Sequence, residues 1–276
     1  MKRILIAEDE RATGYLLDKV LKDAGYETKL VTDGVAALEA LRAEPFDLML
    51  LDIWMPRMSG LEVLASMRVE NLGIKAVVMT SDGTPETVLR AVRDQAYHYV
   101  SKPVKPQELL ELVRDTLAAK PLPPVEVISA RPEWVELLLP CQIEAADRIQ
   151  SLLSRLLGDL PEEVRDNVGY VFSEMLRNAV EWGGGLDPNR KVRVTYVRAR
   201  RMVLYRIADP GPGFRFEGLL HAAAGRPEGD PVAHIEEREK LGLRPGGFGI
   251  ATVRAMVDEL IYNEAQNEVV FVKYLD

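Results

Sequence analysis

The stretch Asp47-Leu48-Met49-Leu50-Leu51, followed directly by Asp52-Ile53-Trp54-Met55-Pro56-Arg57-Met58-Ser59-Gly60, decides the fold of the first half of this chain. A short, continuous apolar run is typical of a strand that is buried on both faces, as the strands of a parallel sheet are. Asp52 is therefore expected at the carboxyl end of a buried strand.

Similar apolar runs occur on either side of this strand, at residues 4–7, 28–31, 75–79 and 97–100. The segments between the runs repeat apolar residues with a period of about 3.6, which is typical of helices. Alternating strands and helices predict an α/β fold, with a doubly wound five-stranded parallel sheet covered by helices. Ligands of such sheets bind beyond the carboxyl ends of the strands.

Polar side chains follow most of these predicted strands. Glu8 and Asp9 follow the first strand, Asp52 the third, Thr80 the fourth and Lys102 the fifth. Clustered carboxylates repel each other unless a cation neutralises them, and a cluster of oxygen ligands suits Mg²⁺. A carboxylate nucleophile beside a divalent cation, a hydroxyl and a lysine is what phosphoryl transfer to an aspartate requires.

The overall composition limits the classes of function. A length of 276 residues indicates two domains, at the usual ~100–200 residues for each domain. The formal net charge of -8, without a run of Lys or Arg, argues against nucleic-acid binding. Cys141 is the only cysteine, so no internal disulfide can form, which fits a reducing compartment. The N-terminal apolar run ends at Glu8, too early for a signal peptide or a membrane span. We therefore expect a cytoplasmic protein that binds neither nucleic acid nor a membrane.

A proline-rich segment, Lys120-Pro121-Leu122-Pro123-Pro124, separates the two predicted domains. Each proline fixes its own φ, lacks a donor and restrains the residue before it, so no helix continues through this segment. We expect a first domain over residues 1–119, a linker over 120–128 and a second domain over 129–276. The linker would either hold the domains within a limited range of separations or act as a plain spacer.

The second half follows a different pattern. We expect strands at 133–139, 191–198, 202–208 and 269–274, and helices at 144–157, 161–182 and 249–260. The stretch 214–244 is polar, rich in Gly and Pro and long for a connection inside a compact domain, which favours a functional lid. The pattern predicts an α+β fold, with helices packed against a mostly antiparallel sheet.

The first half resembles the response-regulator receiver domains, whose fold is flavodoxin-like. The matching residues are Glu8-Asp9, the run Asp52–Gly60, Thr80-Ser81 and the run Tyr99–Pro103. The resemblance implies that Asp52 accepts a phosphoryl group from an upstream histidine kinase or phosphotransfer protein. Glu8 stands where the family often has Asp, which preserves a carboxylate oxygen at that position.

The same resemblance assigns roles to the neighbouring residues. It implies that Glu8, Asp9, Asp52 and the carbonyl of Trp54 hold Mg²⁺. It also implies that Thr80, Lys102 and Tyr99 respond to the phosphorylated state, and that the Lys102–Pro103 peptide bond is cis.

Three motifs of the second half carry potential chemistry. Glu174 and Asn178 lie four residues apart and hence on one face of a predicted helix; a Glu can accept a proton and an Asn oxygen can ligate Mg²⁺. The segment Asp209-Pro210-Gly211-Pro212-Gly213 follows a strand, and its carboxylate can accept a hydrogen bond from an exocyclic amine. The segment Pro245-Gly246-Gly247-Phe248-Gly249-Ile250 opens a helix, whose N-terminus can face a phosphate.

In this order the motifs resemble the GHKL superfamily of ATP-binding domains, which fold as an α+β Bergerat-type sandwich. The compact size and the ending Arg244–Leu260 look most similar to the anti-sigma-factor serine kinases. The resemblance implies ATP and Mg²⁺ as cofactors, with these roles: Asn178 for Mg²⁺, Asp209 for the adenine amine, Gly211 and Gly213 for the adenine pocket, Gly246, Gly247 and Gly249 for the phosphates, and Glu174 as general base. Trp182 stands where that branch commonly has His. The resemblance implies that this difference leaves the Mg²⁺ and adenine contacts intact but affects the rate of phosphoryl transfer.

Three outputs follow from these resemblances. In the first, phosphorylation of Asp52 controls a serine/threonine kinase that acts on an anti-sigma-factor antagonist. In the second, the ATP-bound domain only sequesters a sigma factor or another regulator, without catalysis. In the third, the domain phosphorylates a histidine of a partner; its own histidines, His98, His221 and His234, are poorly placed for self-phosphorylation. The resemblances leave a homodimer open.

Overall fold

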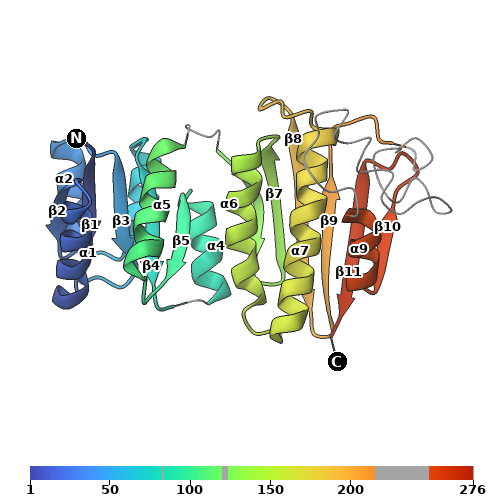
Figure 1. Ribbon diagram of the computed structural model, residues 1–276, viewed down its shortest axis with the longest axis horizontal. Coiled ribbons are helices and arrows are strands. Elements are labelled where there is room, and N and C mark those ends of the chain that lie inside the picture. Colours follow the sequence, from blue (N-terminus) through green and yellow to red (C-terminus); the bar gives the residue numbers. More distant parts are fainter. Residues whose placement is uncertain (83, 120–123, 215–248, 276) are drawn as a thin grey trace. The chain divides into compact units, whose positions relative to one another are not determined.

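The computed structural model describes residues 1–82, 84–119, 124–214 and 249–275. The chain divides into two compact units, one of residues 1–122 with 151–156 and the other of residues 123–150 with 157–276. The first unit holds strands β1 to β5, and the second holds β6 to β11 (Figure 1). The predicted linker over 120–128 stays a prediction: residues 120–123 lie outside the described ranges, and β6 begins at Glu126.

The first unit is a parallel sheet of five strands in the order β2-β1-β3-β4-β5. This confirms the predicted doubly wound α/β fold. The elements are β1 (Arg3–Ala7), α1 (Arg11–Asp23), β2 (Glu27–Val31), α2 (Gly34–Ala43), β3 (Leu48–Asp52), α3 (Gly60–Val69), β4 (Lys75–Thr80), α4 (Pro85–Arg93), β5 (His98–Ser101) and α5 (Pro106–Ala118).

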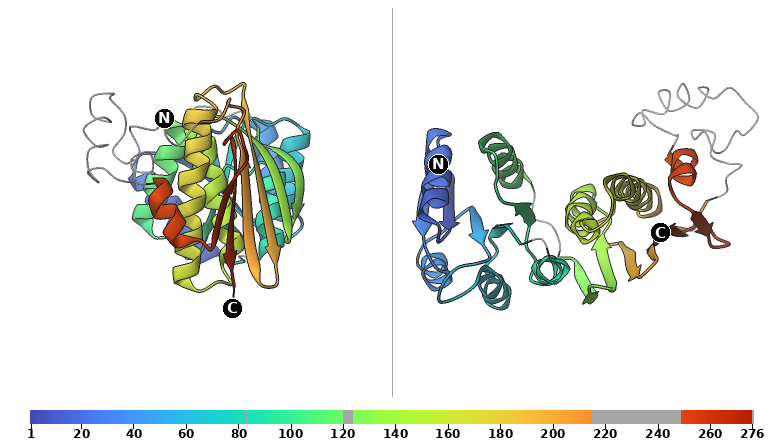
Figure 2. Two further views of the ribbon diagram at one scale, coloured as in Figure 1. Left: turned by 90° about the vertical axis from the view of Figure 1, so that its right-hand side faces the viewer. Right: turned by 90° about the horizontal axis from the view of Figure 1, so that it is seen from below.

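Helices cover both faces of this sheet. On one face α1 and α5 pack together, and on the other α3 lies between α2 and α4 (Figure 2). Ile4 and Ile6 of β1 contact buried residues of α1 and α5, among them Leu21 and Val113. Because the central strands are buried on both faces, polar side chains can collect only at and beyond their carboxyl ends.

Local capping fixes where two of these helices begin. The Asp33 carboxylate accepts a hydrogen bond from the Ala36 N–H at 2.9 Å and starts α2. Ser59 and Glu62 form a capping box, in which each side chain bonds to the backbone of the other, and this starts α3. The loop between β3 and α3 is therefore held at both ends, with Asp52 at one and Ser59 at the other.

The second unit is a six-stranded sheet in the order β10-β11-β9-β8-β7-β6, and every pair of neighbouring strands is antiparallel. This confirms the predicted α+β fold. The elements of this half of the chain are β6 (Glu126–Arg131), β7 (Trp134–Pro140), α6 (Ile143–Leu153), η1 (Ser154–Leu157), α7 (Glu162–Asn178), η2 (Ala179–Gly183), β8 (Lys191–Ala199), β9 (Met202–Ala208), α9 (Gly249–Met256), β10 (Glu259–Tyr262) and β11 (Glu268–Tyr274). Residues 151–156, at the end of α6 and in η1, belong to the first unit.

Aromatic rings join the strands of this sheet to α7. Tyr196 of β8, Tyr205 of β9 and Phe271 of β11 are neighbours across the sheet, each ring centroid 5.1 Å from that of the next. Phe172 of α7 packs on Tyr205 with a centroid distance of 4.6 Å. Burial of rings of this size is a major contribution to the stability of a core, so α7 is held firmly against the central strands.

Two helices predicted for the second half were wrong at their C-terminal boundaries. The helix predicted to end at 260 ends at Met256, because residues 259–262 pair with β11 as the edge strand β10. The helix predicted to 182 is an α-helix only to Asn178 and then becomes the π-helical turn η2. Strand β6 was not predicted at all. The lid predicted at 214–244 lies, apart from Phe214, outside the described residues.

Among the helices of the described ranges, none combines the length and the apolar character that a membrane span requires.

The two leucines Leu21 and Leu16 of α1 provide a matched test of the core. Leu21 is fully buried and Leu16 is 49% exposed. We expect Leu21→Ala to lower the free energy of unfolding by about 2–5 kcal/mol, because it removes buried methyl groups and leaves a cavity. We expect Leu16→Ala to change it by less than about 0.5 kcal/mol. Urea denaturation followed by circular dichroism measures both, and equal effects would contradict the assigned packing.

Candidate functional site

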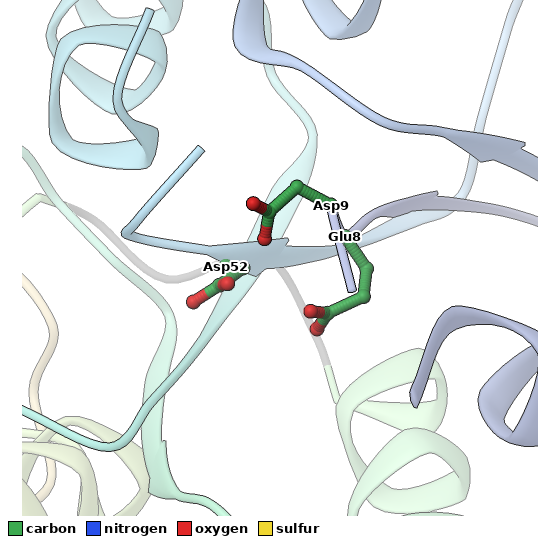
Figure 3. A group of neighbouring side chains, drawn as sticks. All are labelled: Glu8, Asp9 and Asp52. Carbon is green, nitrogen blue, oxygen red and sulfur yellow. The ribbon is translucent and has the colours of Figure 1, made fainter. Parts of the chain in front are cut away.

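The first candidate site lies at the carboxyl ends of the parallel strands. Glu8 and Asp9 directly follow β1, and Asp52 is the last residue of β3. Their side chains gather at one place (Figure 3), and one carboxylate oxygen from each lies within 4.8 Å of the others. Thr80 ends β4 at the same edge of the sheet. The predicted convergence of strand-end residues is thus found in the structure.

Lys102 supplies the positive charge at this edge. Its Nζ lies 2.7 Å from Glu8 Oε2 and 2.9 Å from Asp52 Oδ2. Glu8 and Asp52 are buried, with 1% and 5% of their surfaces exposed. The Lys102–Pro103 bond is cis, as expected.

Burial and the contacts with Lys102 act in opposite directions on the pKa values at this edge. Burial raises the pKa of Glu8, and the attraction of Lys102 offsets this only in part. Burial lowers the pKa of Lys102, but its hydrogen bonds to Glu8 and Asp52 outweigh that effect and hold its pKa above the ordinary value. Lys102 therefore remains a cation between the two carboxylates over the physiological pH range.

The loop after Asp52 depends on a glycine. A Cβ on Gly60 would lie 2.1 Å from the backbone oxygen of Asp52, so only glycine allows α3 to begin so close to β3. The N–H of Trp54 points at the Asp52 carboxylate, 3.4 Å from Oδ1, while the indole is 60% exposed. The backbone of Trp54 thus lies beside the carboxylate, and its side chain faces solvent.

The oxygen donors at this edge fit a hard divalent cation. Glu8 and Asp52 are buried, whereas Asp9 is exposed and leaves room for water ligands. Mg²⁺ prefers a few carboxylates together with water, which matches this set of groups.

Thr80 and Tyr99 contact the same loop. The Thr80 hydroxyl accepts a hydrogen bond from the Asp82 N–H at 3.1 Å, and the Tyr99 hydroxyl donates one to the Asp82 carbonyl. Both side chains are buried, with 1% exposed. Burial raises the pKa of Tyr99 to about 12, so its hydroxyl keeps its proton. The loop after β4 is thus bound to two of the three residues predicted to respond to phosphorylation.

The second candidate site surrounds Asp209, directly after β9. The Gly211 N–H donates to Asp209 Oδ1 at 2.8 Å. Burial raises the pKa of Asp209, against smaller opposing effects of this hydrogen bond and of Arg190. A Cβ on Gly183 would lie 2.1 Å from Asp209 Cγ, so the carboxylate rests against the end of η2. The end of the predicted Asn-bearing helix and the predicted adenine loop are therefore neighbours.

Glu174 and Asn178 are half-buried on α7, one turn apart, as the sequence predicts. α7 then widens into η2, where Trp182 is 50% exposed. π-helical turns of this kind occur frequently at functional sites. Gly249 begins α9, which packs against α7. Gly246 and Gly247, predicted to contact phosphates, lie outside the described residues, as do Arg244, His221 and His234.

Two residues of the second site were missed from the sequence. The Arg190 guanidinium donates to the carbonyls of Gly184 and Pro210, and thereby joins the segment after η2 to the Asp209 loop. Asn267 bonds to the same loop from the turn between β10 and β11. Neither residue belongs to a motif, and the strand β10, which precedes the turn that holds Asn267, was not predicted; its first two residues were placed in a helix.

Two family models match the chain. The response regulator receiver domain matches residues 4–114, and the histidine kinase-like ATPase domain matches residues 139–273. The first match lies within the first unit, and the second lies mostly within the second unit.

Curated relatives and solved structures match as well. The DNA-binding response regulator MtrA of Mycobacterium tuberculosis is 30% identical over 182 residues, which is 66% of this chain and 78% of MtrA. The response regulator protein PmrA of Pseudomonas aeruginosa is 31% identical over 231 residues, 76% of this chain and 100% of PmrA. A CheY-like receiver domain protein of Methanospirillum hungatei superposes with a TM-score of 0.41 at 32% identity, over 42% of this chain and 94% of that one.

Asp9 tests the divalent-cation site without disturbing the Lys102 pair. We expect Asp9→Asn to weaken Mg²⁺ binding by roughly tenfold or more, because the charge count of the ligands governs affinity for hard cations. Isothermal titration calorimetry measures the affinity. Asp23→Asn, the same change at the exposed end of α1, is the control and should bind Mg²⁺ as the unaltered protein does. Unchanged binding by Asp9→Asn would exclude Asp9 as a ligand.

Proposed function

This chain belongs to the response regulator family and joins a receiver domain to a histidine kinase-like ATPase domain, and on that premise we propose that phosphorylation of Asp52 controls an ATP-binding output. The observation that carries the proposal is the placement of Lys102 Nζ, 2.9 Å from the Asp52 carboxylate and 2.7 Å from that of Glu8. A carboxylate at a strand end beside a fixed cation is suited to receive a phosphoryl group.

In the proposed reaction, an Asp52 carboxylate oxygen forms a bond to phosphorus while the bond from phosphorus to the donor breaks. The donor is an upstream histidine kinase or phosphotransfer protein. The ammonium group of Lys102 compensates the negative charge of the phosphoryl group that is transferred to Asp52. Mg²⁺, held by Glu8, Asp9, Asp52 and the Trp54 carbonyl, would supply further positive charge to the phosphoryl oxygens.

Thr80 and Tyr99 are the proposed switch. Both bind the backbone of Asp82, which lies in the loop after β4. A phosphoryl group on Asp52 offers the Thr80 hydroxyl a strong acceptor at the same edge of the sheet. Movement of Thr80 toward it would release the Asp82 N–H, and the loop would then rearrange together with Tyr99.

The second domain is proposed to bind ATP with Mg²⁺ around Asp209. Its half-buried carboxylate has one oxygen bonded to the Gly211 N–H, which leaves acceptor capacity for the adenine amine. Gly211 and Gly213 would shape the adenine pocket, Asn178 would ligate Mg²⁺, and Gly246, Gly247 and Gly249 would contact the phosphates. The close packing of Gly183 against Asp209 supports this placement, because it brings α7 to the carboxylate.

We propose that this domain transfers the γ-phosphoryl group of ATP to a serine or threonine of an anti-sigma-factor antagonist. Glu174, half-buried one turn before Asn178, would accept the proton of the attacking hydroxyl. The relative MtrA is named as a DNA-binding response regulator. In this chain the segment after the receiver instead matches a histidine kinase-like ATPase domain, and the chain has a net charge of -8. The proposed output is therefore directed at a protein and not at nucleic acid.

Trp182 favours a second candidate function. It is 50% exposed on η2, where anti-sigma serine kinases commonly have His. A large exposed ring suits a contact with a partner, so the ATP-bound domain would sequester a sigma factor or another regulator without catalysis. A kinase that acts on a partner histidine is the remaining alternative.

Control by Asp52 is tested through the affinity for ATP. We expect beryllofluoride, a phosphoryl mimic, to change the ATP affinity by about 5–150-fold, the usual range of allosteric coupling. Asp52→Asn, which cannot take up the mimic, should show no change. Isothermal titration calorimetry with and without beryllofluoride measures both proteins. Equal ATP affinity in the two conditions would show that the domains are not coupled.

Kinase activity is tested with labelled ATP and candidate anti-sigma-factor antagonists. We expect phosphoserine or phosphothreonine on the antagonist, and a loss of about 100-fold or more in rate for Glu174→Ala, because general-base catalysis typically contributes 10²–10⁴-fold. Glu163→Ala, an exposed glutamate on the first turn of the same helix, is the control and should retain the rate. ATP-dependent binding of a regulator without transfer would favour sequestration, and label on a histidine would favour the remaining alternative.

A further inference from the structure

The turn between β10 and β11, residues 263–267, is closed by its own side chains. The Asn263 carbonyl oxygen Oδ1 accepts from the N–H groups of Asn267 and Glu268, each at 3.1 Å, and its amide donates to Asn267 Oδ1 at 2.8 Å. Gln266 takes a left-handed conformation with a φ of 59°. These bonds give the turn one defined shape and fix the direction of the Asn267 amide.

This turn is bound to the Asp209 loop at three points. The Asp209 N–H donates to the Asn267 carbonyl at 2.9 Å, and Asn267 Nδ2 donates to the Gly211 carbonyl at 2.9 Å. Gly213 has a φ of 82°, and a Cβ there would overlap the Ala265 carbonyl. Asn267 therefore holds the loop both before and after the Asp209 side chain.

The bond to Gly211 reaches the Asp209 carboxylate through the backbone. The Gly211 N–H donates to Asp209 Oδ1, and the Gly211 carbonyl accepts from Asn267. On the other side, a Cβ on Gly183 would lie 2.1 Å from Asp209 Cγ. The carboxylate thus stands between the end of η2 and a loop that Asn267 keeps in place, with little freedom to turn.

We propose that Asn267 is a positioning residue for nucleotide recognition: by holding Gly211, it aims the Asp209 carboxylate at the exocyclic amine of the base and so sets the preference for adenine over purines that lack this amine. The inference rests on the proposed nucleotide site at Asp209. Asn267 itself does not touch the nucleotide.

The test compares ADP with IDP, whose base carries a carbonyl in place of the adenine amine. Isothermal titration calorimetry with magnesium measures both affinities for the full chain and for Asn267→Ala. We expect Asn267→Ala to bind ADP about tenfold more weakly and to bind IDP as the unaltered protein does. Asn189→Ala, which removes an amide donor bonded to Asp187 in a turn of the same unit, is the matched control and should leave both affinities unchanged.

Each result decides the matter in one direction. Loss of ADP affinity with unchanged IDP affinity supports the positioning role, and the unchanged IDP binding shows that the variant is folded. An equal loss of affinity for both nucleotides would show that Asn267 only maintains the fold, and an unchanged ADP affinity would show that Asn267 has no role in recognition. Each of these two results would overturn the inference about Asn267 but would leave the proposed nucleotide site at Asp209 intact. An unaltered protein that binds neither nucleotide would contradict the proposed site and the inference with it.

Discussion

One ammonium group lies between two buried carboxylates in the receiver, and the packing of the strand ends around them depends on this contact. Removing a charge from water costs several kcal/mol unless a partner and hydrogen bonds compensate it. Glu8 and Asp52 share Lys102, whose Nζ lies within 3 Å of both. The parallel sheet makes this sharing feasible, because it brings the ends of β1, β3 and β5 to one edge. The same contact fixes the Asp52 carboxylate at the edge where the proposed phosphoryl transfer would take place.

The second unit stabilises a half-buried carboxylate in another way. Asp209 has no lysine partner among the described residues; the N–H of Gly211 and the charge of Arg190 oppose the effect of burial on its pKa. Backbone groups hold the carboxylate less strongly than a direct ion pair, and the loop therefore needs support from outside. Asn267 and Arg190 give that support from segments far away in sequence. The two sites thus represent two solutions to the same problem of desolvation.

The sequence predicted the features that are local or repeated, and it missed those that depend on distant pairing. The run 48–51 and the carboxylate after it predicted both a buried strand and its reactive end, because apolar runs and strand ends are visible in a single segment. Residues 259–262 were not predicted as a strand, and the first two were placed in the preceding helix, since four residues with mixed polarity carry no decisive period and only pairing with β11 makes them a strand. The π-helical turn at 179–183 and the role of Asn267 have no local signal of either kind.

The tryptophans described above have an optical consequence. Trp54 is the only one in the receiver, two residues after Asp52, and its indole is 60% exposed. Trp182 is 50% exposed on η2, whose last residue rests against Asp209. Each candidate site therefore contains an intrinsic fluorophore in contact with solvent, and the emission of the unlabelled protein adds these two signals to that of Trp134, which is 48% exposed on β7. Replacing Trp134 together with one of the other two indoles by phenylalanine would leave a single fluorophore, and events at each site could then be timed separately.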